Sequence, residues 1–453
     1  MTPREVLALC REKDVKAVDL RFCDLWGGWQ HLTIPVGKLD EAVFEEGLGF
    51  NGASFRGWQS IHESDLLIIP QPGTAFLNPF TALPTIALIC NVQDPVTGEP
   101  YSRDPRHIAS KAANFLKHTG IADVALFGPK AEFFVFDDAQ FGQTSHESFV
   151  RLESGNISGP RETAAESADS LMDLRNDMTQ AMIECGLDVE GHHQQLQSAG
   201  QCQIDLRQQP LVAMADGLMI YKHCVRSVSQ RHGKTATFMP QPLLGVSGSG
   251  MNTHLSLWRD DEPLFAGSGY AGLSETALYA IGGILRHAPA LLAFTCPTTN
   301  SYKRLMKDQR APVNLVYSQR NRSAACRIPM SSQTPLSRRI EFRCPDPASN
   351  PYLAFAAILM AAIDGIQLKL NPGQPVEKDL FELSAEQRSS FAQTPETLAD
   401  ALTALENDCE FLLADGVFTP DVIHTWVEQK REHEVDAIRR RPHPYEFSLY
   451  YDA

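Results

Sequence analysis

Eight arginines lie between positions 304 and 343 of a chain that is otherwise acidic. The 453 residues carry a formal charge of −15, yet Arg304, Arg322, Arg339 and Arg343 all fall within this one stretch. A guanidinium group is planar and always charged, so it suits the binding of carboxylates and phosphates. The pattern indicates a site for an anionic substrate. We expect Arg304, Arg322 and Arg343 to line a pocket and Arg338 to face solvent.

Two shorter motifs carry weaker signals. The pair His192-His193 could indicate a transition-metal site, but Gln194 and Gln195 follow it directly, and we expect a packed, hydrogen-bonded pair. The motif Gly248-Ser-Gly250 occurs in plain turns as well as in ligand-binding loops.

The composition excludes several classes of function. Apolar residues make up 43% of the chain and charged residues 21%, as in ordinary globular proteins. The acidic balance argues against binding to nucleic acid or to an anionic membrane. The ten cysteines form no CxxC motif, which predicts reduced thiols and a cytoplasmic location. The longest apolar run, 352–363, is too short to span a bilayer, so we expect a soluble protein.

The elements that would position these residues favour an α+β fold of two parts. In residues 1–103, a helix at 2–14 is followed by strands at 16–22, 29–34 and 85–92. In residues 104–453, we expect helices at 104–119, 169–185, 214–232, 274–288 and 350–370. Strand patterns recur between them at 125–127, 132–136, 188–190, 202–206, 235–238, 254–257 and 340–343. Residues 154–168 and 371–396 are predicted surface loops.

A series of segments, in order along the whole chain, resembles bacterial type I glutamine synthetase. They are 51–65, 128–134, 189–201, 234–240, 248–251, 300–304, 320–324, 338–346 and 443–451. The resemblance implies a small N-terminal β-grasp-like domain (1–103) and a large C-terminal domain with a curved antiparallel sheet covered by helices (104–453). It also implies a homo-oligomer of two stacked hexameric rings, in which the tail 444–451 enters the facing ring.

The same resemblance implies an ATP-dependent ligase in which an acyl phosphate of glutamate reacts with ammonia. Family members neutralise charge in this reaction with two Mg²⁺ or Mn²⁺ ions held mainly by glutamates. The positions for the first ion are Glu132, Gln195 and Gln203, and those for the second are Lys130, Asn252 and Glu341. The family pattern has five carboxylates at these positions. This chain keeps two of them and adds one lysine.

Other positions that the resemblance assigns are partly kept and partly changed. Asn51 replaces an aspartate of the ammonium pocket, and Arg310 replaces the flap glutamate that takes a proton. Arginine cannot act as a general base near neutral pH. Retained positions are Arg304, Arg322 and Arg343 for the carboxylate and phosphates, Glu190, Ser256 and Arg339 for the nucleotide, and Gly248 and His193 for the substrate.

The small number of carboxylates predicts that the two-metal route is lost, so that the chain is a non-catalytic or repurposed relative, a pseudoenzyme. Two alternatives stay open. In one, Lys130 and Arg310 supply charge for altered chemistry on a polyanionic or carboxylate substrate. In the other, the chain is a γ-glutamyl ligase with one weak ion on Glu132. The expected ligands are a small carboxylate or nucleotide, ATP among them, and at most one weakly bound Mg²⁺ or Mn²⁺.

Overall fold

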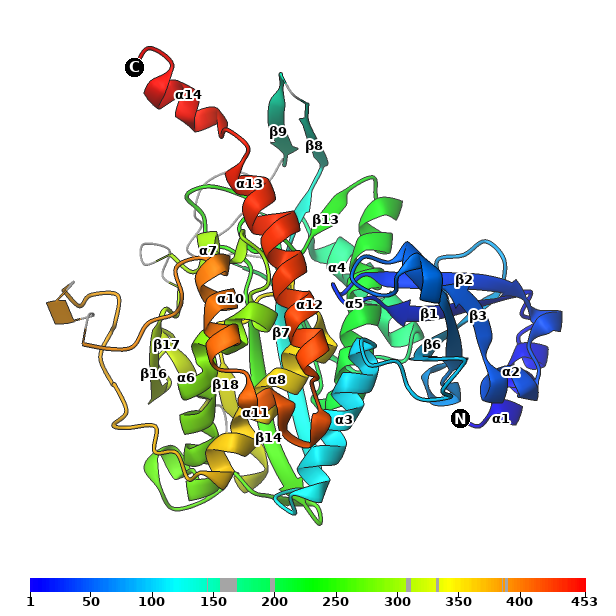
Figure 1. The fold of residues 1–453 in the computed structure, drawn as a ribbon, viewed down its shortest axis with the longest axis horizontal. Coiled ribbons are helices and arrows are strands. Elements are labelled where there is room, and N and C mark those ends of the chain that lie inside the picture. The colour runs from blue at the N-terminus through cyan, green and yellow to red at the C-terminus, as the bar shows by residue number, and fades with distance from the viewer. Residues whose placement is uncertain are drawn as a thin grey trace.

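The described residues form two large β-sheets, one in each part of the chain, and a separate two-stranded sheet (Figure 1). The computed structural model describes residues 1–144, 146–154, 169–195, 200–306, 311–330, 334–384, 386–387 and 390–453. The predicted loop 154–168 therefore lies almost wholly outside the described residues. Within them, helices and strands mix as the α+β prediction requires, and that prediction is confirmed.

The N-terminal sheet has six strands in the order β2-β1-β6-β4-β3, with β5 paired to β6. Strands β1 and β6 run parallel, whereas β1–β2, β4–β6, β3–β4 and β5–β6 are antiparallel. The turn between β1 and β2 is closed by Asp24, whose Oδ1 accepts hydrogen bonds from the backbone N–H groups of Trp26 (3.0 Å) and Gly28 (2.8 Å). The bounds are β1 Ala17–Cys23, β2 Trp29–Pro35, β3 Leu48–Asn51, β4 Asp65–Pro70, β5 Phe76–Leu77 and β6 Thr85–Gln93.

The C-terminal sheet has ten strands in the order β10-β11-β7-β14-β18-β17-β16, with β12 and β13 beside β7 and β15 beside β14. Its pairs are antiparallel except for β16–β17. The bounds are β7 Val124–Phe136, β10 Val189–Gln194, β11 Gln201–Leu206, β12 Gln209–Pro210, β13 Thr235–Thr237, β14 Met251–Arg259, β15 Glu262–Pro263, β16 Asn314–Gln319, β17 Ala324–Ile328 and β18 Ile340–Phe342. A separate hairpin joins β8 (Asp138–Gln143) to β9 (Ser148–Glu153).

One face of strand β7 packs against the helices, and its other face belongs to the polar side of this sheet. Phe127 stacks on Phe355 of α8 (Pro351–Gln367), and Phe133 contacts Tyr221 of α5 (Leu211–Arg231). Successive side chains of a strand point to opposite faces. Because these odd-numbered residues face the helices, the side chains of Lys130 and Glu132 lie on the other face.

Helices α6 (Glu275–Thr295) and α8 pack at very short range. A Cβ on Gly283 would lie 2.0 Å from the carbonyl oxygen of Ala361, and one on Gly365 would lie 2.6 Å from the Cα of Gly283. The predicted helix 274–288 stops too early, because α6 continues through Pro289 into the core. In the described part of the chain, α6 is the one helix long and apolar enough to cross a membrane. However, 72% of its most apolar window is buried inside the fold, as in a core helix.

Other helices complete the two parts. They are α1 Pro3–Glu12, α2 Glu41–Glu46, α3 Pro105–His118, α4 Met172–Glu184, α7 Ser301–Arg304, α10 Leu398–Asn407, α11 Glu410–Leu413, α12 Pro420–Lys430, α13 Ala437–Arg439 and α14 Pro444–Tyr450. Helix α14 extends away from the body (Figure 1), and its aromatic side chains Tyr445, Phe447 and Tyr450 are exposed. All ten cysteines are free thiols. Nine are buried and Cys409 is partly buried.

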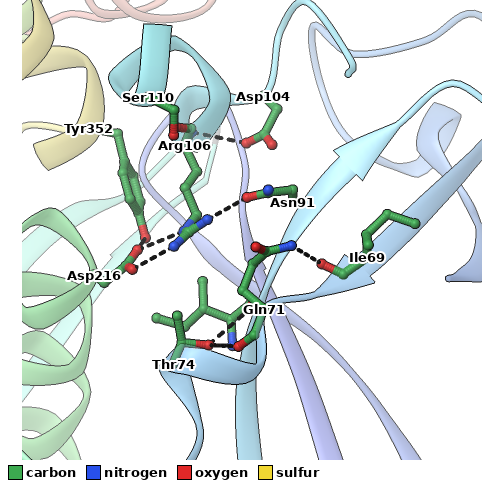
Figure 2. Close-up of polar contacts among 10 residues, drawn as sticks. Ile69, Gln71, Thr74, Asn91, Asp104, Arg106, Ser110, Asp216 and Tyr352 are labelled. Atoms are coloured by element: carbon green, nitrogen blue, oxygen red, sulfur yellow. Dashed lines mark hydrogen bonds and ion pairs between the residues drawn. The ribbon is translucent and has the colours of Figure 1, made fainter. Parts of the chain in front are cut away.

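A buried ion pair joins the N-terminal sheet to the helical layer (Figure 2). Arg106 of α3 donates to both carboxylate oxygens of Asp216 on α5, at 2.9 and 2.8 Å, and to Oδ1 of Asn91 on β6, at 2.5 Å. Tyr352 of α8 donates its hydroxyl to Asp216 at 2.7 Å. Burial lowers the pKa of Arg106, but Asp216 outweighs that effect and raises it. Four elements therefore meet at one charged contact.

His287 makes the stability of the helical layer depend on pH. Its ring bridges Asp408 (2.8 Å from Nδ1) and Asp364 (3.0 Å from Nε2). Burial lowers the pKa of His287, but the bonds to Asp408 and Asp364 outweigh it and raise the pKa above its usual value. A raised histidine pKa stabilises the fold below the unfolded pKa of about 6.5, and that contribution is lost as pH rises through the folded value.

In the wild type, the contribution of His287 to the free energy of unfolding should be lost between about pH 6 and about pH 9. We expect a smaller loss over this range in His287→Gln, measured by urea denaturation. The matched control is His118→Gln, because the side chain of His118 is 70% exposed and should change this pH dependence little. Equal pH dependence in wild type and His287→Gln would contradict the assignment.

Candidate active site

Polar side chains from four neighbouring strands meet on the face of the C-terminal sheet opposite the helices. Residues two apart on a strand share a face. This rule places Lys130 with Glu132 on β7 and Asn252 with His254 on β14. Register pairs Lys130 with Asn252, Glu132 with Gln203, and His254 with Glu341. The polar residues on this face of the sheet therefore form one continuous row across β11, β7, β14 and β18.

Glu132 lines a cavity of about 170 Å³. Its Oε2 accepts from the backbone N–H of Gly250 at 2.7 Å, and its Oε1 accepts from Nε2 of Gln195 at 2.9 Å. Burial raises the pKa of Glu132 to about 6, against the lowering effect of the Gly250 N–H and of Arg304. The lining residues are Glu132, Gln195, Gln201, Ser247, Gly248, Gly250, Asn252, Arg304, Ala311, Pro312 and Arg343.

A chain of hydrogen bonds links Glu132 to Lys130. Nε2 of Gln195 also donates to Oε1 of Gln203 at 2.9 Å, and Nε2 of Gln203 donates to Oδ1 of Asp205 at 2.6 Å. The other oxygen of Asp205 accepts from Nζ of Lys130 at 2.7 Å. Asp205 thereby fixes the ammonium group on the polar face of the sheet.

Glu341 on β18 is held between two guanidinium groups and an imidazole. Its side chain is 2% exposed and accepts from Arg327 and Arg343, each at 2.5 Å, and it lies 3.0 Å from Nε2 of His254. Burial raises the pKa of Glu341, but His254, Arg343 and Arg327 outweigh it and hold the pKa well below its usual range. This carboxylate is ionised and already fully engaged.

Three arginines each have a buried Nε donor: Arg304 lines the cavity, whereas Arg327 of β17 and Arg339, directly before β18, lie outside its lining. The Nε atoms of Arg304, Arg327 and Arg339 are buried and have no hydrogen-bond partner among the described residues. A buried N–H donor without an acceptor is costly, so these groups indicate a bound anion as the missing partner. The backbone at Gly248 leaves no room for a side chain, since a Cβ there would lie 2.3 Å from the carbonyl oxygen of Pro240 and 2.9 Å from Cγ of Arg304.

The structure places only some of the predicted site residues in or beside the cavity. Glu132, Gln195, Asn252, Gly248, Arg304 and Arg343 line the cavity. Gln203, Lys130 and Glu341 lie beside it on the same face. Exposed Arg322 lines a neighbouring cleft of about 420 Å³ with Arg320 and Lys378, and its carbonyl oxygen accepts from Nε of Arg343 at 3.2 Å.

The remaining predicted residues do not line the cavity. Glu190 and His193 are exposed on β10, whereas Ser256 is buried on β14 and accepts from Nε1 of Trp258 at 3.0 Å. Asn51 ends β3 in the N-terminal sheet, opposite Asp65. Arg310 lies outside the described residues.

Sequence reasoning missed four functional candidates: Asp205, Arg327, His254 and Gln201. Three of them lie two residues along a strand from a predicted residue. The fourth, Arg327, is the register partner of a predicted residue on the neighbouring strand. Gln203 indicates Gln201 and Asp205 on β11, and Asn252 indicates His254 on β14. Arg327 faces Glu341 across the β17–β18 pair. The alternation of the strands could have identified Gln201, Asp205 and His254, whereas Arg327 follows only from the β17–β18 register.

The side chains at the implied metal positions do not fit a pair of divalent ions. Among the described residues, no group of three or more His, Cys, Asp or Glu side chains is arranged to hold a metal ion. Lys130 places a cation at one of the positions, and the oxygens of Glu132 already accept N–H groups.

Comparisons with known proteins agree along the whole chain. The family model "Glutamine synthetase, catalytic domain" matches residues 102–450, and "Glutamine synthetase, beta-Grasp domain" matches residues 14–95. A glutamine synthetase of Aquifex aeolicus is 53% identical over 100% of this chain and 99% of its own, and one of Frankia alni is 51% identical over 99% and 98%. A solved Plasmodium falciparum glutamine synthetase superposes with a TM-score of 0.90 at 25% identity, covering 100% and 99% of the two chains.

These relatives contradict the prediction of a non-catalytic or repurposed pseudoenzyme. Proteins that are 48–53% identical over nearly their full length carry the name glutamine synthetase. The prediction counted charge only at the positions that the resemblance assigns to metal ions. It left out Asp205 and Arg327, so it took the changed residues for a dismantled site. Lys130, Gln195 and Gln203 instead join Asp205 and Glu132 in one chain of hydrogen bonds, and Arg327 forms an ion pair with Glu341.

Proposed function

Because this chain belongs to the glutamine synthetase family, we propose that it is an ATP-dependent ligase that joins ammonia to the γ-carboxylate of glutamate. The observation that carries the proposal is the match over the full chain to glutamine synthetases at up to 53% identity. The structural neighbour described as "GmaS/ADP complex", with a TM-score of 0.85 and 28% identity over 99% of both chains, supports a nucleotide site on this fold.

In this reaction a γ-carboxylate oxygen attacks the terminal phosphorus of ATP, the bridging P–O bond breaks, and ADP leaves. The amine nitrogen then attacks the acyl carbon, the C–O bond to phosphate breaks, and a proton passes from nitrogen to solvent. Such transfers depend mainly on positioning and on neutralising the phosphate charge. The spare Nε–H donors of Arg304, Arg327 and Arg339 support this role, because phosphate oxygens would supply their missing acceptors.

The cavity around Glu132 supplies the second requirement, a site that holds the reacting carboxylate close to the phosphate. Gly248 lets the backbone approach that cavity, and Arg304 and Arg343 place positive charge in its wall. We place the substrate carboxylate between these two guanidinium groups.

We also propose that the chain assembles as two stacked hexameric rings. The family forms homo-oligomers, and exposed α14 with its aromatic side chains supports a contact with another copy. Deletion of residues 442–453 should separate the rings, which light scattering would detect as a halved mass. The cytoplasmic location, favoured by ten free thiols, stays a prediction.

The test of the activity is amide formation by the purified full-length protein with glutamate, ATP, MgCl₂ and ammonium. We expect glutamine, ADP and phosphate in equal amounts, and γ-glutamyl hydroxamate when hydroxylamine replaces ammonium. Reactions without glutamate or without amine are the controls. Absence of any amide product above the protein-free background would overturn the proposal, as would ADP release that does not depend on the amine.

A further inference from the structure

We infer that side-chain cations of the protein stand in for divalent ions in this site: the Lys130 ammonium, held by Asp205, and the Arg327 and Arg343 guanidinium groups, held by Glu341. This inference rests on the proposed ligase function and names the source of positive charge for it. It predicts that the chain by itself does not bind a pair of divalent ions.

Lys130 lies opposite Asn252 in the β7–β14 pair, and both face the site. Its Nζ is 2.7 Å from Asp205, which also accepts from Gln203 at 2.6 Å, so the carboxylate has one hydrogen-bonded partner on each oxygen. The ammonium is therefore fixed at this position, where it would repel a divalent ion.

Glu341 is the one carboxylate kept at the positions of the second ion, which it shares with Lys130 and Asn252. Both of its oxygens accept from guanidinium groups at 2.5 Å, and Nε2 of His254 is 3.0 Å from Oε2. At 2% exposure this carboxylate is closed off by its partners. A metal ion could bind it only by displacing them.

Gln195 and Gln203 replace carboxylates at the positions of the first ion, and Gln201 lies beside them on β11. Gln195 presents N–H donors to both Glu132 and Gln203, and Gln201 donates to Glu132 at 3.3 Å and to the carbonyl oxygen of Gly248 at 3.1 Å. A metal ion needs oxygen acceptors directed at it. Here the oxygens of Glu132 face N–H groups instead.

Arginine and lysine on this face also explain where the anion would bind. Buried Nε donors of Arg304, Arg327 and Arg339 remain without a partner among the described residues. Arg327, which blocks Glu341, can therefore also contact a phosphate oxygen directly through its Nε. Side-chain cations in place of divalent ions keep the positive charge that phosphoryl transfer needs, although the ligands of the ions are gone.

The experiment is a Mn²⁺ titration of the full-length protein without nucleotide, followed by electron paramagnetic resonance of free Mn²⁺. We expect no saturable binding of two ions per chain. The variant Lys130→Glu, combined with Gln195→Glu, Gln203→Glu and Asn252→His, should gain at least about tenfold in Mn²⁺ affinity, since each change supplies a ligand or removes a cation. The matched control is Lys38→Glu, which alters charge at an exposed position outside the site.

Two saturable Mn²⁺ ions per wild-type chain would overturn the inference, and this measurement does not depend on whether the combined variant folds. The single variant Lys130→Glu gives a second readout, and affinity no greater than that of Lys38→Glu would also count against it. The result is separable from the ligase test. Amide formation with two bound ions refutes the inference alone, whereas a chain without paired ions that forms no amide refutes the proposed function.

Discussion

Replacing Arg343 with methionine should lower kcat/KM for amide formation by about 100-fold or more, the loss typical for one charged donor that stabilises a transition state. Arg343 lines the cavity beside Glu132 and is held there by Glu341 at 2.5 Å. Methionine keeps much of the side-chain volume but removes the charge. Steady-state kinetics with ATP and glutamate varied in turn would measure the loss.

The matched control is Arg338→Met, in the same segment of sequence but outside the cavity-lining set, which should retain activity within about twofold. Glu341 keeps Arg327 and His254 as partners when Arg343 is replaced, so the fold should persist, and the thermal midpoint should confirm this. Equal activity of the two variants would show that Arg343 does not act on the substrate.

Replacing Asp216 with alanine should reduce the free energy of unfolding by about 3–5 kcal/mol, because it leaves the Arg106 guanidinium buried without its counter-charge. The Arg106 side chain is 10% exposed and that of Asp216 is 11% exposed. The hydroxyl of Tyr352 loses its acceptor as well. Urea denaturation would show the change as a lower midpoint.

The ion pair of Arg103 with Asp421 provides the control. Its Nη2–Oδ1 distance is 2.7 Å, like that of the buried pair, but the Asp421 side chain is 51% exposed. Asp421→Ala should therefore cost only about 0–1 kcal/mol. The double variant Arg106→Met, Asp216→Leu should recover much of the stability lost in Asp216→Ala. Similar losses in Asp216→Ala and Asp421→Ala would refute the role given to burial.

Elements with strong end signals could be predicted from the sequence. Asp104 caps α3 before Pro105, and Asn350 caps α8 before Pro351, each with its side chain accepting a backbone N–H. The prediction failed where tertiary pairing decides the outcome. Two separate strands were expected at 125–127 and 132–136, but β14 pairs along Val124–Ala131 and β11 along Glu132–Phe134, so β7 is continuous.

The site could be predicted as a set of positions but not as a network. Lys130, Glu132 and Glu341 belong to one face, and the resemblance identified each. The partner of Lys130 is Asp205, which depends on the register of β11 against β7, and no local pattern in the sequence specifies that register. For the same reason, the number of carboxylates at the implied metal positions could not distinguish an inactive site from an active site with a different arrangement of charges.

The buried cysteine thiols can report local unfolding of the protein, because they react with reagents only when the surrounding structure opens. Nine cysteines spread through both sheets and the helical layer are shielded from reagents in the folded chain, and only Cys409 is partly accessible. A brief pulse of an alkylating agent followed by peptide mass analysis would therefore rank the regions by how often they open. Cys90 of β6 would report on the small sheet and Cys326 of β17 on the large one, without any engineered label.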